Sequence, residues 1–286
     1  MRRDRDPGTF PALWAGLFDD AAVYPPAYVP LHDAVAAYRA HREAWYAPLV
    51  GPLLVPPSRC VELFRLADPS ASQLRVGLTI RPGIHPELLA MAAAGLAATK
   101  RVGVSIVELG WHPEWREVGL DVTSVPTALE VPRGPAQSTA LADIRRARDE
   151  GARVGAKFRT GTTPNWEWPD ESELADFLLE VVRRRLPFKL TGGLHHAVRG
   201  RYTTLGEEGE NHGLLNVVLA IAAALAEANE SVVTSVLADR DTERLVARVQ
   251  DLSAEQVDSI RDRFVAYAVC AVTDPINELN SLGLLD

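Results

Sequence analysis

Two lysines, Lys157 and Lys189, lie in short apolar segments whose alternation is typical of β-strands. In both segments the apolar residues take every second position, so each lysine points to the face opposite the apolar one. Lysines are rarely buried without a partner. Two ammonium groups on adjacent strands, about 4.8 Å apart, repel each other, and we expect at least one to lose its proton more easily. A neutral amine in a closed pocket attacks carbonyl carbons and forms Schiff bases.

Carboxylates lie where they can serve these lysines. Glu108 and Glu130 stand at the ends of two earlier strand-like segments. There they either transfer protons during catalysis or keep the second lysine charged. A structural layer of ion pairs among the four residues is the alternative, because buried charge networks also form without catalysis. Asp19 and Asp20 are interpreted either as acids on the first strand or as a cap.

Further polar residues lie at the same strand ends or in the loops that follow. We expect these to orient polar groups of a substrate: Arg81, Arg159, Thr191, His195, Arg199 and His212. A metal site containing His195, His196 or His212 is an alternative. However, adjacent histidines on an extended chain point in opposite directions and cannot share a metal as an i, i+4 pair on a helix does. We therefore assign no metal ligand. Asn211 precedes an apolar helix and is interpreted as its cap.

The elements that must position these residues alternate between two patterns. Short apolar segments predict strands at 49–55, 74–80, 102–109, 127–131, 153–158, 187–190 and 264–272, with a weaker one near 21–24. Helical patterns cover 31–45, 58–67, 86–98, 138–150, 171–185, 214–228 and 242–263. Strands that alternate with helices form a parallel sheet, because each return crossover is a helix.

An open, doubly wound sheet and a closed eight-stranded barrel both satisfy this order. The polar residues at the carboxyl ends of different strands favour the barrel, which collects its active site at that rim. We therefore predict an α/β fold, a single (β/α)8 TIM-type barrel of parallel strands over residues 1–286. The apolar helix 214–228 should pack on its outside, covered by the segment 242–263 or by a second subunit.

Composition excludes several classes of partner. The chain has 286 residues and a net charge of −8 without a basic run, so no nucleic-acid partner is expected. The longest apolar run, 214–226, is shorter than the roughly 18 residues of a membrane span, so no membrane partner is expected either. The two cysteines, Cys60 and Cys270, are interpreted as packing residues, and a cytoplasmic location is the simplest expectation. A homo-oligomer stays open.

Two short motifs connect the chain with a known family. Lys157-Phe158-Arg159-Thr160-Gly161 and Lys189-Leu190-Thr191-Gly192-Gly193 begin 32 residues apart (189 − 157). They resemble the motifs of the deoxyribose-phosphate aldolases, class I (Schiff-base) aldolases built on a (β/α)8 barrel, in which Lys-x-x-Thr-Gly lies on the sixth strand and Lys-x-x-Gly-Gly on the seventh. Ala128-Leu129-Glu130 is similar to the end of the family's fifth strand, and Glu108 stands where the family carries an aspartate. The resemblance covers residues 100–195.

The resemblance implies a lyase of the aldolase type acting on a small-molecule carbonyl substrate, with no external cofactor. Lys157 would form the Schiff base, and Lys189 would lower its pKa by charge repulsion. The family binds phosphate at a Gly-Ser-rich turn after the last strand, where this chain reads Tyr267-Ala268-Val269-Cys270-Ala271, so phosphate recognition is not supported. Two alternatives stay open: a metal-assisted hydrolase or isomerase on the same rim, and a non-catalytic barrel used as a binding subunit.

Overall fold

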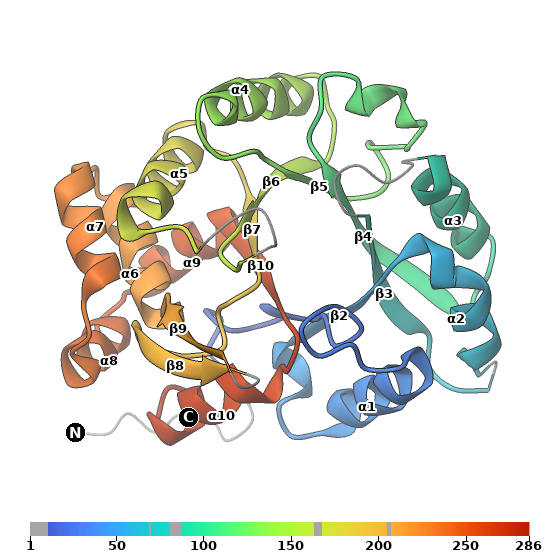
Figure 1. The fold of residues 1–286 in the computed structure, drawn as a ribbon, viewed down its shortest axis with the longest axis horizontal. Coiled ribbons are helices and arrows are strands. Elements are labelled where there is room, and N and C mark those ends of the chain that lie inside the picture. The colour runs from blue at the N-terminus through green and yellow to red at the C-terminus, as the bar shows by residue number, and fades with distance from the viewer. Residues whose placement is uncertain (1–10, 69, 81–86, 163–167, 205–206, 286) are drawn as a thin grey trace.

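Eight parallel strands close into a barrel at the centre of the molecule (Figure 1). The computed structural model describes residues 11–68, 70–80, 87–162, 168–204 and 207–285. The barrel strands are β1 (Phe18–Asp20), β2 (Val50–Val55), β3 (Leu74–Thr79), β4 (Val102–Gly110), β5 (Thr127–Glu130), β6 (Val154–Arg159), β7 (Phe188–Thr191) and β10 (Phe264–Val269). They are hydrogen-bonded in sequence order, and β10 closes the ring by pairing with both β7 and β1. The predicted (β/α)8 architecture is confirmed.

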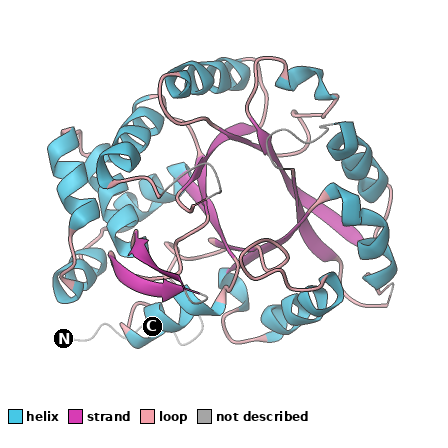
Figure 2. Ribbon diagram, in the orientation of Figure 1, coloured by secondary structure: helices cyan, strands magenta, loops and turns pink. Residues whose placement is uncertain are grey.

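Helices form an outer layer around this ring (Figure 2). They are α1 (Leu31–Glu43), α2 (Cys60–Leu66), α3 (Glu87–Ala97), α4 (Ala136–Asp149), α5 (Glu171–Arg183), α6 (Leu214–Leu225), α7 (Glu230–Ala238), α8 (Thr242–Gln250), α9 (Ala254–Arg263) and α10 (Thr273–Ser281). Short 3₁₀ turns add η1 (Ala47–Leu49), η2 (Pro57–Arg59) and η3 (Trp115–Val118). Between β4 and β5 the connection contains only η3, so the helix layer is thinnest there.

Aromatic rings on the outer face of the barrel decide which way the inner side chains point. Phe177 of α5 lies with its ring centroid 4.4 Å from that of Phe158 on β6 and 5.4 Å from that of Phe188 on β7. Phe188 in turn stacks on Phe264 of β10 at 5.5 Å. Because neighbouring residues on a strand point to opposite faces, Lys157, beside Phe158, is directed into the barrel. The inward orientation predicted from the alternation is confirmed.

The connection between β7 and β10 carries most of the additional structure. It contains an antiparallel hairpin, β8 (Gly200–Thr204) and β9 (Glu207–Asn211), followed by the helices α6 to α9. The apolar helix α6 packs against α5, α7, α8 and α9 and is buried along most of its length (Figure 1). The prediction that the segment 242–263 covers this helix is confirmed, and α7 shares that role.

Four local expectations were wrong. The first strand is β1, before the expected 21–24, and it carries two aspartates, a residue type depleted in strands. The polar segment before α6 forms the hairpin, and Gly213 rather than Asn211 is the N-cap of α6. Ser253 and Gln256 form a capping box that starts α9 and divides the predicted helix 242–263. The last strand ends at Val269 rather than 272.

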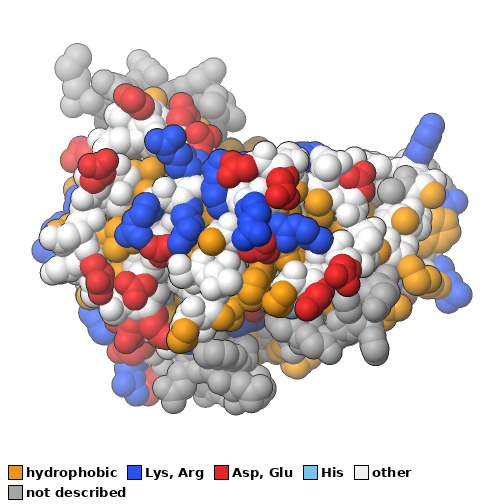
Figure 3. All heavy atoms as spheres, turned by 90° about the horizontal axis from the view of Figure 1, so that it is seen from above, with side chains coloured by type: hydrophobic (Ala, Val, Ile, Leu, Met, Phe, Trp, Pro, Cys, Tyr) orange, Lys and Arg blue, Asp and Glu red, His pale blue; other side chains and the backbone are white. Residues whose placement is uncertain are grey.

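Within the described residues, no helix combines the length and apolar character that crossing a membrane would require. The face drawn in Figure 3 carries acidic and basic side chains next to one another, with apolar side chains between them. Ion pairs also join described residues elsewhere on the surface, for example Arg244 with Asp239 and Asp241.

The aromatic cluster between α5 and the barrel should dominate local stability. Phe177 is fully buried and contacts rings on two strands, so Phe177→Ala should lower the free energy of unfolding by about 3–5 kcal/mol. Phe64→Ala on α2 is the matched control, because Phe64 is 42% exposed; it should cost about 1 kcal/mol or less. Urea unfolding followed by circular dichroism measures both. Equal losses for the two variants would contradict this assignment.

Candidate active site

Glu108 of β4 joins the two buried lysines. Its Oε2 lies 2.8 Å from the Nζ of Lys157 on β6, and its Oε1 accepts a hydrogen bond from the Nζ of Lys189 on β7. All three side chains are within the barrel, with Glu108 fully buried and each lysine 1% exposed. Lys157 and Lys189 are register partners on adjacent strands, so a single carboxylate can reach both. The predicted convergence of these residues is confirmed.

Carboxylates on either side extend this pairing into an alternating chain of charges. Lys157 also lies 3.1 Å from Glu130 Oε2, and Glu130 in turn receives two hydrogen bonds, at 2.9 and 3.2 Å, from Arg159. At the other end Lys189 donates to Asp19 of β1. Three cations therefore alternate with three carboxylates: Asp19, Lys189, Glu108, Lys157, Glu130 and Arg159. With all six groups ionised the cluster is neutral, which is the condition for burying so many charges.

The structure changes the electrostatic argument for a reactive lysine, because the carboxylate of Glu108 lies between the two ammonium groups. The sequence predicted that repulsion between the two ammonium groups would favour a neutral amine. In the structure Glu108 separates them, and the pKa of Lys189 is raised: burial acts to lower it, but Asp19 and Glu108 outweigh burial. Lys189 therefore does not act on Lys157 as an unscreened neighbouring charge. Lys189 instead donates hydrogen bonds to Glu108 and Asp19 and fixes the position of both carboxylates.

The two glutamates are strongly held in their ionised form. Burial acts to raise the pKa of Glu108, but Lys157 and Lys189 outweigh it and lower the pKa to about 2. Burial also acts to raise the pKa of Glu130, and Lys157 together with Arg159 lowers it to about 2. Both carboxylates are therefore negative in the resting site.

Asp19 and Asp20 turn out to be acids on the first strand rather than a cap. Burial raises the pKa of Asp19 to about 6, even though Lys189 acts against it. Burial likewise raises the pKa of Asp20 to about 6, and its Oδ1 accepts a hydrogen bond from the backbone N–H of Ala22. The glycine at position 51 on β2 leaves the space that Asp19 occupies, since a Cβ there would lie 1.9 Å from its Oδ1. This close approach was not visible in the sequence.

Lysine is rare in this chain, so the buried positions of Lys157 and Lys189 are informative. The sequence contains three lysines, Lys100, Lys157 and Lys189, against 27 arginines (30 − 3). Only Lys100 is exposed. A purely structural ion pair is usually better served by arginine, whose fork matches a carboxylate, whereas a lysine can lose its proton and become a nucleophile.

The other predicted site residues are distributed along the rim. Arg159 is directed at Glu130, and Thr191 is its register partner on β7. Arg199 is engaged by Glu171, Glu210 and the carbonyl of Asn211, and so connects α5 with the hairpin. Arg81 lies outside the described residues. The assignment of these four to substrate binding stays a prediction.

The three histidines considered for a metal do not come together. His195 Nδ1 lies 2.9 Å from Asp274, His196 Nδ1 lies 2.7 Å from Glu278, and His212 Nε2 donates to the carbonyl of Pro169 at 2.7 Å. Burial lowers the pKa of His212, so its ring is neutral at pH 7. Across the part of the chain that the structure describes, no three His, Cys, Asp or Glu side chains are grouped as metal ligands. Substrate binding by His195 and His212 stays a prediction.

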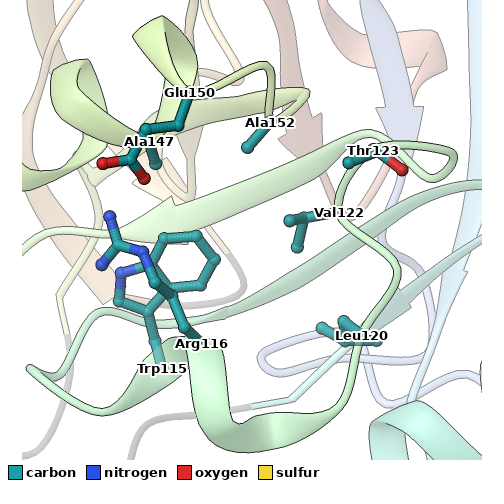
Figure 4. A pocket seen from close by; sticks show the side chains of 8 residues that line it. All are labelled: Trp115, Arg116, Leu120, Val122, Thr123, Ala147, Glu150 and Ala152. Atoms are coloured by element: carbon teal, nitrogen blue, oxygen red, sulfur yellow. The ribbon is translucent and has the colours of Figure 1, made fainter.

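One pocket of about 220 Å³ lies away from this cluster, at the thin part of the helix layer (Figure 4). Trp115 and Arg116 of η3 line it together with the segment that precedes β5 and the carboxyl-terminal end of α4. The Arg116 guanidinium lies over the Trp115 ring, 4.6 Å from its centroid. Trp111 and Trp115 both donate to Asp143 of α4. The side chains of these two tryptophans are therefore directed toward α4.

A scan against protein-family models and a search of curated proteins both find no match for this chain. The likeness to the deoxyribose-phosphate aldolases thus rests on the short motifs of the sequence alone.

Removing the charge of Asp20 should make the protein more stable above pH 6. Because burial raises its pKa to about 6 from 3.8, Asp20 reduces stability as pH rises through that range. Asp20→Asn keeps an oxygen for the Ala22 N–H and should add about 1–3 kcal/mol at pH 8, but not at pH 3.5. Urea unfolding across this pH range measures the difference. A gain that does not vary with pH would contradict the assignment.

Proposed function

We propose that the protein is a Schiff-base-forming lyase of the aldolase type, in which Lys157 attacks a small carbonyl compound. The observation that carries this proposal is the position of the Lys157 Nζ, buried inside a closed parallel barrel and in contact with Glu108 and Glu130. An amine with two adjacent proton acceptors has what imine chemistry needs. The barrel is an architecture that commonly carries enzymes, with the active site at the carboxyl ends of its strands.

Formation of the imine preserves the charge pattern of the cluster. Glu108 first accepts a proton from the ammonium group of Lys157, and the neutral amine then attacks the carbonyl carbon. The carbonyl oxygen becomes the hydroxyl of a carbinolamine by taking a proton from the attacking nitrogen. Glu108 returns its own proton to that hydroxyl, which leaves as water. The product is an iminium, a cation at the same place as the original ammonium, so Glu108 and Glu130 are ionised and paired again.

Carbon–carbon cleavage follows from the same charges. The iminium accepts electrons from the bond between the α- and β-carbons of the substrate. At the same time, a carboxylate removes the proton of the hydroxyl group on the β-carbon. The bond then breaks to an aldehyde and an enamine on Lys157, which is protonated and hydrolysed. Glu130 is closer to the rim than Glu108, since its side chain is 12% exposed and its partner Arg159 is 27% exposed. We assign the substrate-side proton transfer to Glu130 and the amine-side transfer to Glu108.

The remaining site residues act on position and specificity. Lys189, held by Asp19, fixes Glu108 against Lys157. Arg159 and Thr191 lie next to each other on the rim side of the lysines and orient polar groups of the substrate. The strand that precedes α10 ends in Ala268-Val269 and continues with Cys270-Ala271, which offers no glycine or serine turn for a phosphate. We therefore propose a small carbonyl substrate without a phosphate group.

Borohydride reduction should trap the imine on Lys157. Wild-type protein incubated with a panel of aldehydes, ketones and sugar phosphates should gain one reduced adduct, mapped to Lys157 by peptide mass spectrometry. Lys157→Ala should abolish this adduct, whereas the matched control Lys100→Ala, which removes the exposed lysine, should retain it. If folded wild-type protein stays unmodified across the panel, or is modified at Lys100 alone, the Schiff-base proposal fails and the cluster is a structural layer of ion pairs.

Glu108→Gln should slow imine formation by about 10²–10⁴-fold, because the variant lacks the carboxylate that exchanges the proton with Lys157. The fold should persist, since Lys157 keeps Glu130 and Lys189 keeps Asp19. The rate of borohydride trapping under single-turnover conditions is the measurement. Glu43→Gln, at the exposed end of α1, is the control and should trap at the wild-type rate. A Glu108→Gln rate equal to that of the control would exclude Glu108 as the proton-transfer group.

A further inference from the structure

A second group of reactive side chains lies at the rim, built from three segments far apart in the sequence. His195 follows β7, Cys270 follows β10, and Asp274 is in the first turn of α10. His195 Nε2 lies 3.4 Å from the Sγ of Cys270, and its Nδ1 lies 2.9 Å from Asp274 Oδ2. The imidazole therefore joins the thiol to the carboxylate, one ring nitrogen on each. The sequence had suggested only a packing role for Cys270 and a substrate contact for His195.

This arrangement has the geometry of a nucleophile activated by a base. When Nδ1 donates its proton to Asp274, the other ring nitrogen presents its lone pair to the thiol and can remove the thiol proton. Burial acts to lower the pKa of His195, but the hydrogen bonds with Asp274 and Cys270 outweigh it and raise the pKa to about 9. The raised pKa makes the ring a stronger acceptor for the thiol proton, and once it holds that proton the ring stabilises the negative sulfur beside it.

The surroundings of Cys270 leave the sulfur both activated and reachable. His195 is only 6% exposed, whereas Cys270 is partly exposed, so a reactant can reach the sulfur while the base stays shielded from water. The helix α10 begins three residues after Cys270, and no side chain caps its amino-terminal end. The positive end of a helix favours negative charge on a nearby sulfur or on an oxygen that becomes negative during reaction.

The other cysteine shows what this environment adds. Cys60 lies at the start of α2, also partly exposed, and burial raises the pKa of its thiol to about 11. No hydrogen bond from a described residue supports its sulfur in ionised form. The reactivities of the two cysteines can thus be compared within one chain, because Cys270 lies beside a buried imidazole and Cys60 does not.

We propose that Cys270, His195 and Asp274 form a nucleophilic site that accepts an acyl group from an activated ester or thioester, separate from the imine chemistry of Lys157. The thiol proton passes to His195 Nε2, and the sulfur attacks the acyl carbon. The leaving alcohol or thiol departs with the proton from His195, and the acyl group remains on Cys270. Water, deprotonated by the same nitrogen, then attacks the acyl group and releases a carboxylic acid, and the sulfur recovers its proton. The net reaction consumes one water and needs no oxidant or reductant.

The experiment uses p-nitrophenyl acetate with the full chain. Release of nitrophenolate gives the acylation rate, and peptide mass spectrometry should place a single acetyl group on Cys270. His195→Asn should slow acylation by about 10²-fold or more, because the base is lost. Asp274→Asn should slow it by about 10-fold or more, because the ring can turn or take the other tautomer. Cys60→Ala is the matched control and should leave the rate unchanged.

Acetylation that avoids Cys270, or an unchanged rate in His195→Asn, would overturn the proposal. A measurement on the wild-type protein makes the outcome independent of whether these variants fold. At pH 7 iodoacetamide should alkylate Cys270 at least about tenfold faster than Cys60, because His195 lies beside the sulfur of Cys270, whereas burial raises the pKa of the Cys60 thiol to about 11. Equal alkylation rates for the two cysteines would equally reject an activated Cys270.

Discussion

The structure depends on one carboxylate that serves two buried lysines. An ammonium group inside a barrel is tolerated only if opposite charge and hydrogen bonds compensate for the water it has lost. Glu108 meets this requirement for Lys157 and Lys189 together, and Glu130 and Asp19 complete the compensation on either side. The neighbouring strands β4, β5, β6 and β7 bring the two glutamates to the two lysines, and closure of the ring adds Asp19 from β1. The charge cluster and the barrel specify each other.

The same pairing shapes the chemistry that the site can perform. In the proposed mechanism, one of the two carboxylates beside Lys157 takes a proton from its amine before that amine attacks the substrate. This is a different route from activation by a neighbouring cation, which the sequence had suggested. Its advantage is that the iminium product is also a cation, and the carboxylates that hold the resting amine hold the intermediate as well.

The long connection between β7 and β10 contributes His195 to the second site that we propose. That connection contains the hairpin and helices α6 to α9, and it starts with the segment that carries His195. Cys270 and Asp274 come from outside this connection, from the segment after β10 and the first turn of α10. Under the two proposals, the rim carries an amine nucleophile supplied by a strand and a thiol nucleophile supplied by the segments that follow strands. Loops on a rigid barrel are where such additional chemistry can be placed without disturbing the core.

The sequence by itself determined the architecture and the inward lysines, because alternation and strand–helix order are local properties of the chain. Phe158 and Phe188 facing out require Lys157 and Lys189 facing in, whatever the rest of the fold does. It could not determine the charge state of Lys189, since its partners Glu108 and Asp19 come from strands 81 and 170 residues earlier in the chain. Nor could it determine the partners of Cys270, whose histidine lies 75 residues earlier. Burial and ion pairing are set by groups that only the closed barrel brings together, and these decide which side chains can react.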